Sequence, residues 1–130
     1  MGLLERRKQL ELQMVVLPLR SREIEAICGR AVPYDVDWDS LVHDADALTY
    51  VDNTACHRLN MALRMICTDD LGCDAVRQGL QRVRLRNVAQ PGQRRIAFQH
   101  GVLELDNAFA HGALGMHSDV EIRDTLLAAL

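Results

Sequence analysis

Residues 82–107 read RVRLRNVAQPGQRRIAFQHGVLELDN, and their alternation of apolar and polar side chains sets the expected fold class. Because successive side chains of a strand point to opposite faces, this period predicts strands with one buried face. Residues 89–93 and 100–101 contain Pro-Gly and His-Gly pairs, which are typical of turns. The segment therefore predicts a three-stranded antiparallel meander. Its inward side chains are expected to be Val83, Leu85, Ile96, Phe98, Leu103 and Leu105.

A further strand is expected at residues 34–38, where Tyr34, Val36 and Trp38 alternate with Asp35, Asp37 and Asp39. Charge is unevenly distributed along the chain. Residues 31–57 hold six aspartates and no Lys or Arg, whereas residues 58–95 hold eight arginines and three aspartates. Opposite charges on neighbouring strands attract each other. We therefore expect strand 34–38 to pair with strand 82–86, so that the two charged rows neutralise each other.

Helical periodicity covers most of the remaining chain. A first helix spans about residues 3–17 and is expected to end or kink at Pro18. Residues 55–67 carry a wide apolar arc, which is typical of the most buried helix of a domain. Ser118 and Glu121 have the spacing of a capping box and predict the start of the last helix. Shorter helices are expected at about 21–28, 40–50 and 74–80.

Together these elements predict an α+β fold in a single domain over residues 1–130. Its helices are expected to pack on one face of a small, mostly antiparallel sheet of about four strands. The chain is 48% apolar and 25% charged with a formal net charge of −3, which fits one domain with its own core.

Composition argues against several classes of partner. No apolar run approaches the ~18 residues that a membrane span needs, and the N-terminus lacks a secretory signal. A cytoplasmic protein without a membrane partner is therefore expected. The chain has five aromatic residues, too few for a platform on which nucleic-acid bases stack. We accordingly expect no nucleic-acid partner.

Arg82, Arg84 and Arg86 are the first candidate binding residues. Their functional interpretation is a track for phosphate or nucleic acid. Their structural interpretation is pairing with the aspartates of strand 34–38, and the negative net charge of the chain favours it.

His111, Gly112, Gly115 and His117 are the second candidate set. They lie in a loop before the last helix, and the free N–H groups of a helix N-terminus attract anions. However, the expected capping box at Ser118 already uses those N–H groups. We therefore prefer the interpretation of a capped helix that follows a flexible loop.

No metal or cofactor is expected from the sequence. The five histidines lack the H-x-x-x-H spacing of helical metal sites, and the four cysteines form no C-x-x-C pair. Cys28, Cys56, Cys67 and Cys73 are therefore expected to be free thiols.

Two functions of different classes remain. The first is a non-catalytic interaction module that binds itself, as a homodimer, or binds another protein. Its interface would be an apolar helix that projects from the domain and presents Leu3, Leu10, Met14 and Leu17. The alternative is a metal-assisted, hydrolase-like enzyme that gathers His43, Asp44 and His57 with the loop 111–118. The sequence favours the module, because no catalytic motif is present.

Overall fold

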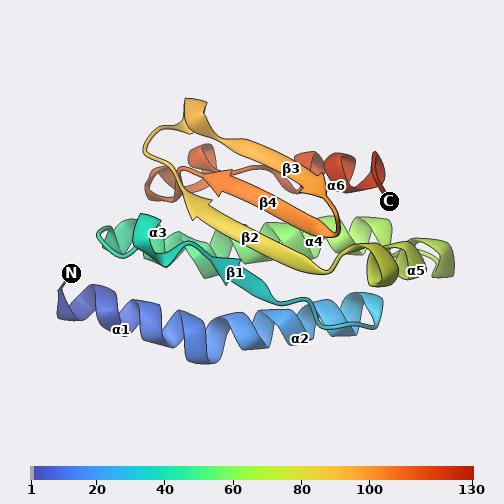
Figure 1. Ribbon diagram of the computed structural model, residues 1–130, viewed down its shortest axis with the longest axis horizontal. Coiled ribbons are helices and arrows are strands. Elements are labelled where there is room, and N and C mark those ends of the chain that lie inside the picture. The colour runs from blue at the N-terminus through green and yellow to red at the C-terminus, as the bar shows by residue number, and fades with distance from the viewer. Residues whose placement is uncertain (1) are drawn as a thin grey trace.

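A computed structural model describes residues 2–130 and places them in a mixed α/β fold around an open four-stranded sheet (Figure 1). The strands follow the order β1-β2-β4-β3 across the sheet. They are β1 (Tyr34–Val36), β2 (Arg82–Asn87), β3 (Arg95–Gln99) and β4 (Val102–Asn107). The strands therefore lie where the alternating pattern predicts them.

The orientation of the strands differs from the prediction. The pairs β1–β2 and β2–β4 are parallel, whereas β3 and β4 are antiparallel. The expectation of a mostly antiparallel sheet and of a three-stranded meander is therefore wrong. Burial gives the reason: Leu103 and Leu105 of β4 are 0% and 1% exposed, whereas Ile96 and Phe98 of β3 are half-buried. β4, which carries the fully buried leucines, takes the interior position, and β3 takes the edge.

Helices pack against the sheet and beside its β1 edge (Figure 1). In Figure 1, α4 lies behind the sheet and α2 runs alongside β1. Two π-helical segments, Leu12–Val16 and Val51–Cys56, join α1 to α2 and α3 to α4 in continuous helical runs. The helices are α1 (Leu3–Glu11), α2 (Leu17–Cys28), α3 (Ala45–Tyr50), α4 (His57–Ile66), α5 (Asp70–Gly79) and α6 (Asp119–Leu127). Short 3₁₀ turns are formed by Trp38–Ser40, Pro91–Gln93 and Phe109–Gly115.

The core lies between the apolar face of the sheet and the helices. On α4, Leu59 and Leu63 are fully buried, and Leu85 of β2 belongs to the same cluster. The prediction that residues 55–67 contain a strongly buried helix is confirmed, since five residues of α4 are buried. The opposite face of the sheet carries the alternating charged side chains of β2, which are exposed.

The helical run does not end at Pro18. Just before it, the N–H of Leu17 donates to the carbonyl of Leu12, five residues back, which is the bond of a π-helical turn. Proline lacks an N–H and clashes with the carbonyl four residues earlier, so a widened turn in front of Pro18 accommodates it. The extra residue also rotates everything after it by about 100° relative to a regular α-helix. Leu17 is therefore buried, at 6% exposed, instead of sharing the outer side of Leu3 and Leu10.

Two other helix starts lie elsewhere than expected. The carboxylate of Asp44 accepts hydrogen bonds from the N–H groups of Asp46 and Ala47, so α3 begins at Ala45. The carboxylate of Asp69 likewise accepts from the N–H of Gly72 at 2.7 Å, so α5 begins at Asp70. In both places an aspartate N-cap sets the boundary.

Candidate functional site

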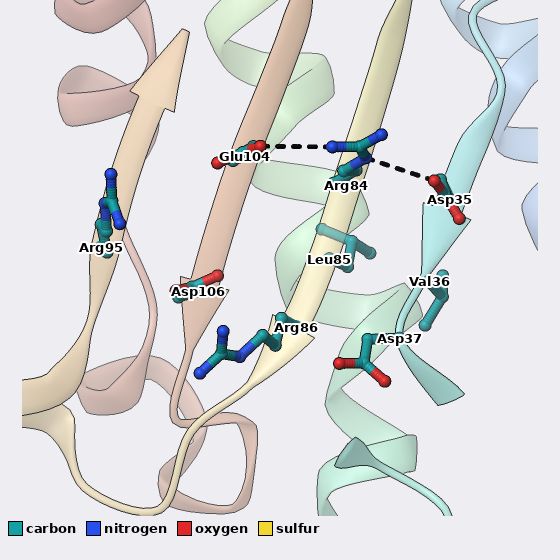
Figure 2. A pocket seen from close by; sticks show the side chains of 9 residues that line it. All are labelled: Asp35, Val36, Asp37, Arg84, Leu85, Arg86, Arg95, Glu104 and Asp106. Carbon is teal, nitrogen blue, oxygen red and sulfur yellow. Dashed lines mark hydrogen bonds and ion pairs between the residues drawn. The ribbon is translucent and has the colours of Figure 1, made fainter. Parts of the chain in front are cut away.

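The exposed face of the sheet carries a shallow pocket of about 330 Å³ (Figure 2). Side chains of all four strands and of the residue that follows β1 contribute to it. The lining residues are Asp35, Val36, Asp37, Arg84, Leu85, Arg86, Arg95, Glu104 and Asp106. Acidic and basic groups therefore alternate across this surface.

Ion pairs cross the three neighbouring strands of this face. Asp35 lies opposite Arg84 in the register of β1 and β2, and its Oδ2 is 3.3 Å from Nε of Arg84. The same Oδ2 is 3.6 Å from Nη1 of Arg82. Arg84 also reaches Oε1 of Glu104 on β4, at 3.4 Å from its Nη1 (Figure 2). The predicted pairing of strand 34–38 with strand 82–86 is confirmed.

Of the expected row Asp35, Asp37 and Asp39, only Asp35 lies on a strand. β1 ends at Val36, and Asp39 falls in the 3₁₀ turn Trp38–Ser40. Within residues 2–130, neither Asp37 nor Asp39 forms an ion pair, and Arg86 forms none either. Asp35 is thus the aspartate that carries the predicted neutralisation.

The electrostatics of this pocket do not suit a polyanion. Its lining holds three arginines and four carboxylates, so the local charge does not favour a phosphate chain. The side chains of Asp35 and Arg84 are 48% and 52% exposed, and exposed ion pairs contribute only about 0–1 kcal/mol. The pocket is a solvated charged surface rather than a preorganised site.

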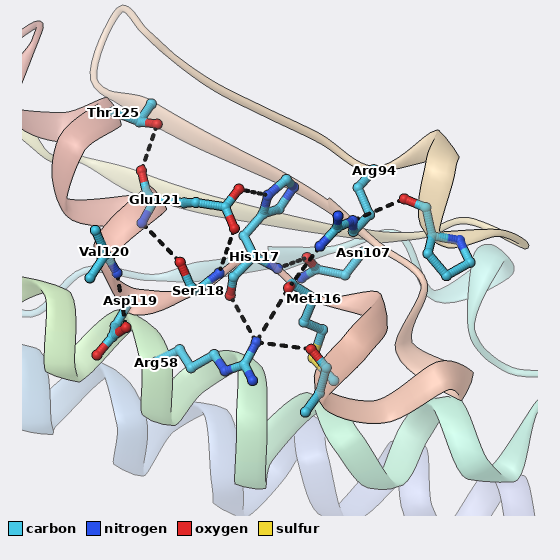
Figure 3. Close-up of polar contacts among 12 residues, drawn as sticks. Arg58, Arg94, Asn107, Met116, His117, Ser118, Asp119, Val120, Glu121 and Thr125 are labelled. Carbon is cyan, nitrogen blue, oxygen red and sulfur yellow. Dashed lines mark hydrogen bonds and ion pairs between the residues drawn. The ribbon is translucent and has the colours of Figure 1, made fainter.

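The loop of the second candidate set is held by two arginines (Figure 3). Nη1 of Arg58 donates to the carbonyls of Ala113 at 3.3 Å, Met116 at 3.3 Å and His117 at 3.2 Å. Nη1 of Arg94 donates to the Met116 carbonyl at 3.1 Å. These bonds fix residues 113–117 against α4 and the turn before β3, so the loop is not the flexible loop that the sequence predicts.

The backbone of this loop requires glycine at positions 112 and 115. Gly112 has a φ of +63°, which L side chains rarely adopt. A Cβ at Gly115 would lie 2.0 Å from the carbonyl oxygen of Ala108. Both positions therefore require glycine for packing and turn geometry.

The two histidines have different surroundings. Nε2 of His111 is 3.1 Å from the carbonyl oxygen of Ala89. His117 is 6% exposed, its Nδ1 is 3.2 Å from Oε2 of Glu121, and its Nε2 has no hydrogen-bond partner among the described residues. The two side chains thus contact different parts of the chain.

The predicted capping box before α6 is confirmed. Oγ of Ser118 accepts from the N–H of Glu121 at 3.1 Å, and Oε1 of Glu121 accepts from the N–H of Ser118 at 3.2 Å. The hydrogen bond from Ser118 and the contact with His117 lower the pKa of Glu121 below its usual range. The N-terminus of α6 is therefore already occupied by a carboxylate of the chain.

Two residues of the hydrolase-like alternative lie at the starts of two different helices. The Asp44 carboxylate caps α3, and His57 begins α4. No three His, Cys, Asp or Glu side chains of residues 2–130 are arranged to hold a metal ion. The gathering of His43, Asp44 and His57 that this alternative requires is thus not found in the described chain.

The outer side of α1 and of the π-helical segment that follows it carries several exposed large apolar side chains. Leu3, Leu10 and Met14 are 60%, 59% and 69% exposed, as the sequence predicts for an interface. Arg7 and Glu11 lie among them and, with Val15, line a shallow hollow there. The sequence favours a place for Arg7 and Glu11 elsewhere around this helix, but their spacing of three or four residues from Leu3, Leu10 and Met14 puts them on the same side.

A polar network between α2, α4 and the second π-helical segment was also missed. Nε of Arg20 is 2.6 Å from Oδ1 of Asp52, and its Nη1 is 2.9 Å from Oε2 of Glu23. Nδ2 of the buried Asn60 donates to the same Glu23 oxygen at 2.6 Å. Burial alone would lower the pKa of Arg20, but the hydrogen bonds to Asp52 and Glu23 raise it above its usual value.

No family model, curated protein or solved structure matches this chain. None of the helices in residues 2–130 has the length and apolar character needed to cross a membrane.

Proposed function

We propose that this protein is a non-catalytic interaction module that forms a homodimer through the outer side of α1. The observation that carries the proposal is a set of large apolar side chains, each more than half exposed, on one side of a single helical run. We call this surface the α1 face. It consists of Leu3, Leu4, Arg7, Leu10, Glu11, Met14 and Val15. A contiguous exposed apolar patch of this kind marks an interaction surface.

The charges of the α1 face favour a second copy of the chain as its partner. Arg7 and Glu11 are one helical turn apart, and neither forms an ion pair with any residue of the described chain. In an antiparallel pair of α1 helices related by a two-fold axis, each Arg7 lies beside the partner's Glu11. The same register places Leu4 beside the partner's Met14. The surface is thus complementary to itself, as a two-fold interface requires.

The α1 face is presented by a helix that is anchored on the domain. Leu12 is buried at 6% exposed on the opposite side of the run. Nζ of Lys8 donates to Oγ1 of Thr49 at 2.7 Å and to the carbonyl of Ala45 at 3.2 Å. The interface is therefore preorganised, which reduces the entropy lost on association. Deleting residues 1–17 would also remove Leu12 and Leu17 from the core, so point substitutions test the surface better.

The test is light scattering on size-exclusion fractions of charge-reversal variants. The wild type is expected to be a dimer, and Arg7→Glu and Glu11→Arg alone are expected to shift towards monomer. An equimolar mixture of the two variants restores both ion pairs and is expected to form a heterodimer. Arg64→Glu, an exposed charge reversal on α4, is the matched control and should stay dimeric. A monomeric wild type, or single variants that dimerise like the control, would refute the proposal.

We also propose a cytoplasmic location for the protein. Four cysteines are present as free thiols, and such thiols persist in reducing compartments.

A further inference from the structure

Three cysteines come together where α2, α4 and α5 meet. Cys28 is the last residue of α2, Cys67 follows α4 and Cys73 lies near the start of α5. Sγ of Cys73 is 3.7 Å from the carbonyl oxygen of Ile27 and 3.8 Å from that of Cys67. Sγ of Cys73 therefore lies directly against the backbone of Cys67. Cys67 and Cys73 are thus neighbours at this corner, and both residues are partly exposed.

A glycine makes this approach possible. A Cβ at Gly72 would lie 2.0 Å from the carbonyl oxygen of Ile66, so the start of α5 rests directly on the end of α4. The Asp69 carboxylate holds this corner by accepting the N–H of Gly72. The short connection therefore places Cys73 against Cys67 by backbone contact, without relying on flexible side chains.

We propose that Cys67 and Cys73 are an oxidisable dithiol, which a peroxide converts into an intramolecular disulfide and a small thiol reduces again. The inference is independent of the homodimer, because this corner lies at the far end of α2 from the α1 face (Figure 1).

The chemistry balances with a peroxide as the two-electron oxidant. The sulfur of Cys73 attacks one peroxide oxygen and the O–O bond breaks, which leaves a sulfenic acid on Cys73 and releases one water. The sulfur of Cys67 then attacks the sulfur of Cys73, and the S–O bond breaks. The hydroxyl leaves with the Cys67 proton as a second water.

The raised pKa of Cys67 indicates the order of these two steps. Burial and the neighbouring Cys73 raise the pKa of Cys67 to about 12, so we assign the first step to Cys73 and the second to Cys67. Burial also raises the pKa of Cys28 and takes that of Cys56 to about 12. Both of these side chains are buried, so they are expected to remain reduced.

The experiment treats the full-length reduced protein with hydrogen peroxide and maps the product by mass spectrometry. Trypsin sites at Arg64 and Arg77 place both cysteines in the peptide 65–77, and a protease that cuts before aspartate then separates them at Asp69 and Asp70. The expected product lacks two hydrogens and stays joined after the second cut until dithiothreitol is added. Sulfonic acids, a Cys28–Cys73 link or unmodified thiols would each refute the proposal.

Variants separate the pair from the other thiols. Cys67→Ser and Cys73→Ser are expected to abolish the joined product, whereas Cys56→Ser should retain it. Gly72→Ala, with its fold checked by circular dichroism, is expected to lower the yield of the disulfide severalfold because it forces α5 away from α4. An unchanged yield in a folded Gly72→Ala variant would contradict the assigned geometry.

Discussion

Arg20 and Arg84 allow a direct test of how burial sets the strength of an ion pair. Each guanidinium bridges two carboxylates, Arg20 between Glu23 and Asp52, and Arg84 between Asp35 and Glu104. Their side chains are 19% and 52% exposed, respectively. We predict that Arg20→Met destabilises the fold much more than Arg84→Met, although both changes remove the same chemical group.

The magnitude follows from the position of Arg20. Breaking a fully buried ion pair costs about 3–5 kcal/mol, and an exposed pair contributes about 0–1 kcal/mol. Arg20 lies between these limits, since Glu23 and Asp52 are 35% and 39% exposed. We therefore expect Arg20→Met to lower the free energy of unfolding by about 2 kcal/mol and Arg84→Met by less than about 1 kcal/mol. Methionine keeps most of the aliphatic packing, so the comparison isolates the charge.

The assay is urea unfolding followed by far-ultraviolet circular dichroism, with the slope of the transition fitted separately for each variant. All samples are measured at one chain concentration, because association alters apparent stability. Equal losses for the two variants, or a larger loss for Arg84→Met, would show that burial does not govern these pairs.

The remaining predictions concern the core and the last helix. Leu105→Ala, at a fully buried position of β4, is expected to cost about 2–5 kcal/mol in urea unfolding. Leu114→Ala, at a side chain 84% exposed, is its control and should change stability by less than about 0.5 kcal/mol. Glu121 has a lowered pKa in the folded state. Its charge therefore stabilises the fold at pH values above the usual carboxyl pKa. This contribution disappears as the pH falls through the lowered pKa. Glu121→Gln should therefore melt earlier than the wild type at neutral pH and equally at pH ~2; a difference in melting temperature that persists in acid would contradict this assignment.

The positions of the strands could be predicted from the sequence, but their neighbours could not. The alternation at Val83 and Leu85 is a local property, and the structure confirms it in β2. Which strand lies beside β2 depends on the comparative burial of β3 and β4, and nothing local encodes that comparison. The charges supplied the one long-range signal, because Asp35 and Arg84 attract across β1 and β2.

Among the candidate interface residues too, local spacing predicts some positions and fails for others. The exposure of Leu3, Leu10 and Met14 follows from helical spacing, as predicted. Leu17 departs from it, because the π-helical turn before Pro18 changes the phase of the helix. The Cys67–Cys73 contact depends on a tight corner at Gly72, and a period of apolar residues carries no information about such a corner.

The parallel pairing at the centre of the sheet also governs how the chain can fold. β2 finds neither of its partners nearby along the chain, since α3, α4 and α5 separate it from β1, and β3 separates it from β4. During synthesis the four-stranded sheet cannot be completed until Asn107 has left the ribosome. Until then, the sheet does not fully cover the apolar sides of the helices made earlier. We therefore expect nascent chains to be prone to aggregation until β4 has emerged, and we expect slow translation before that point to prolong this exposure.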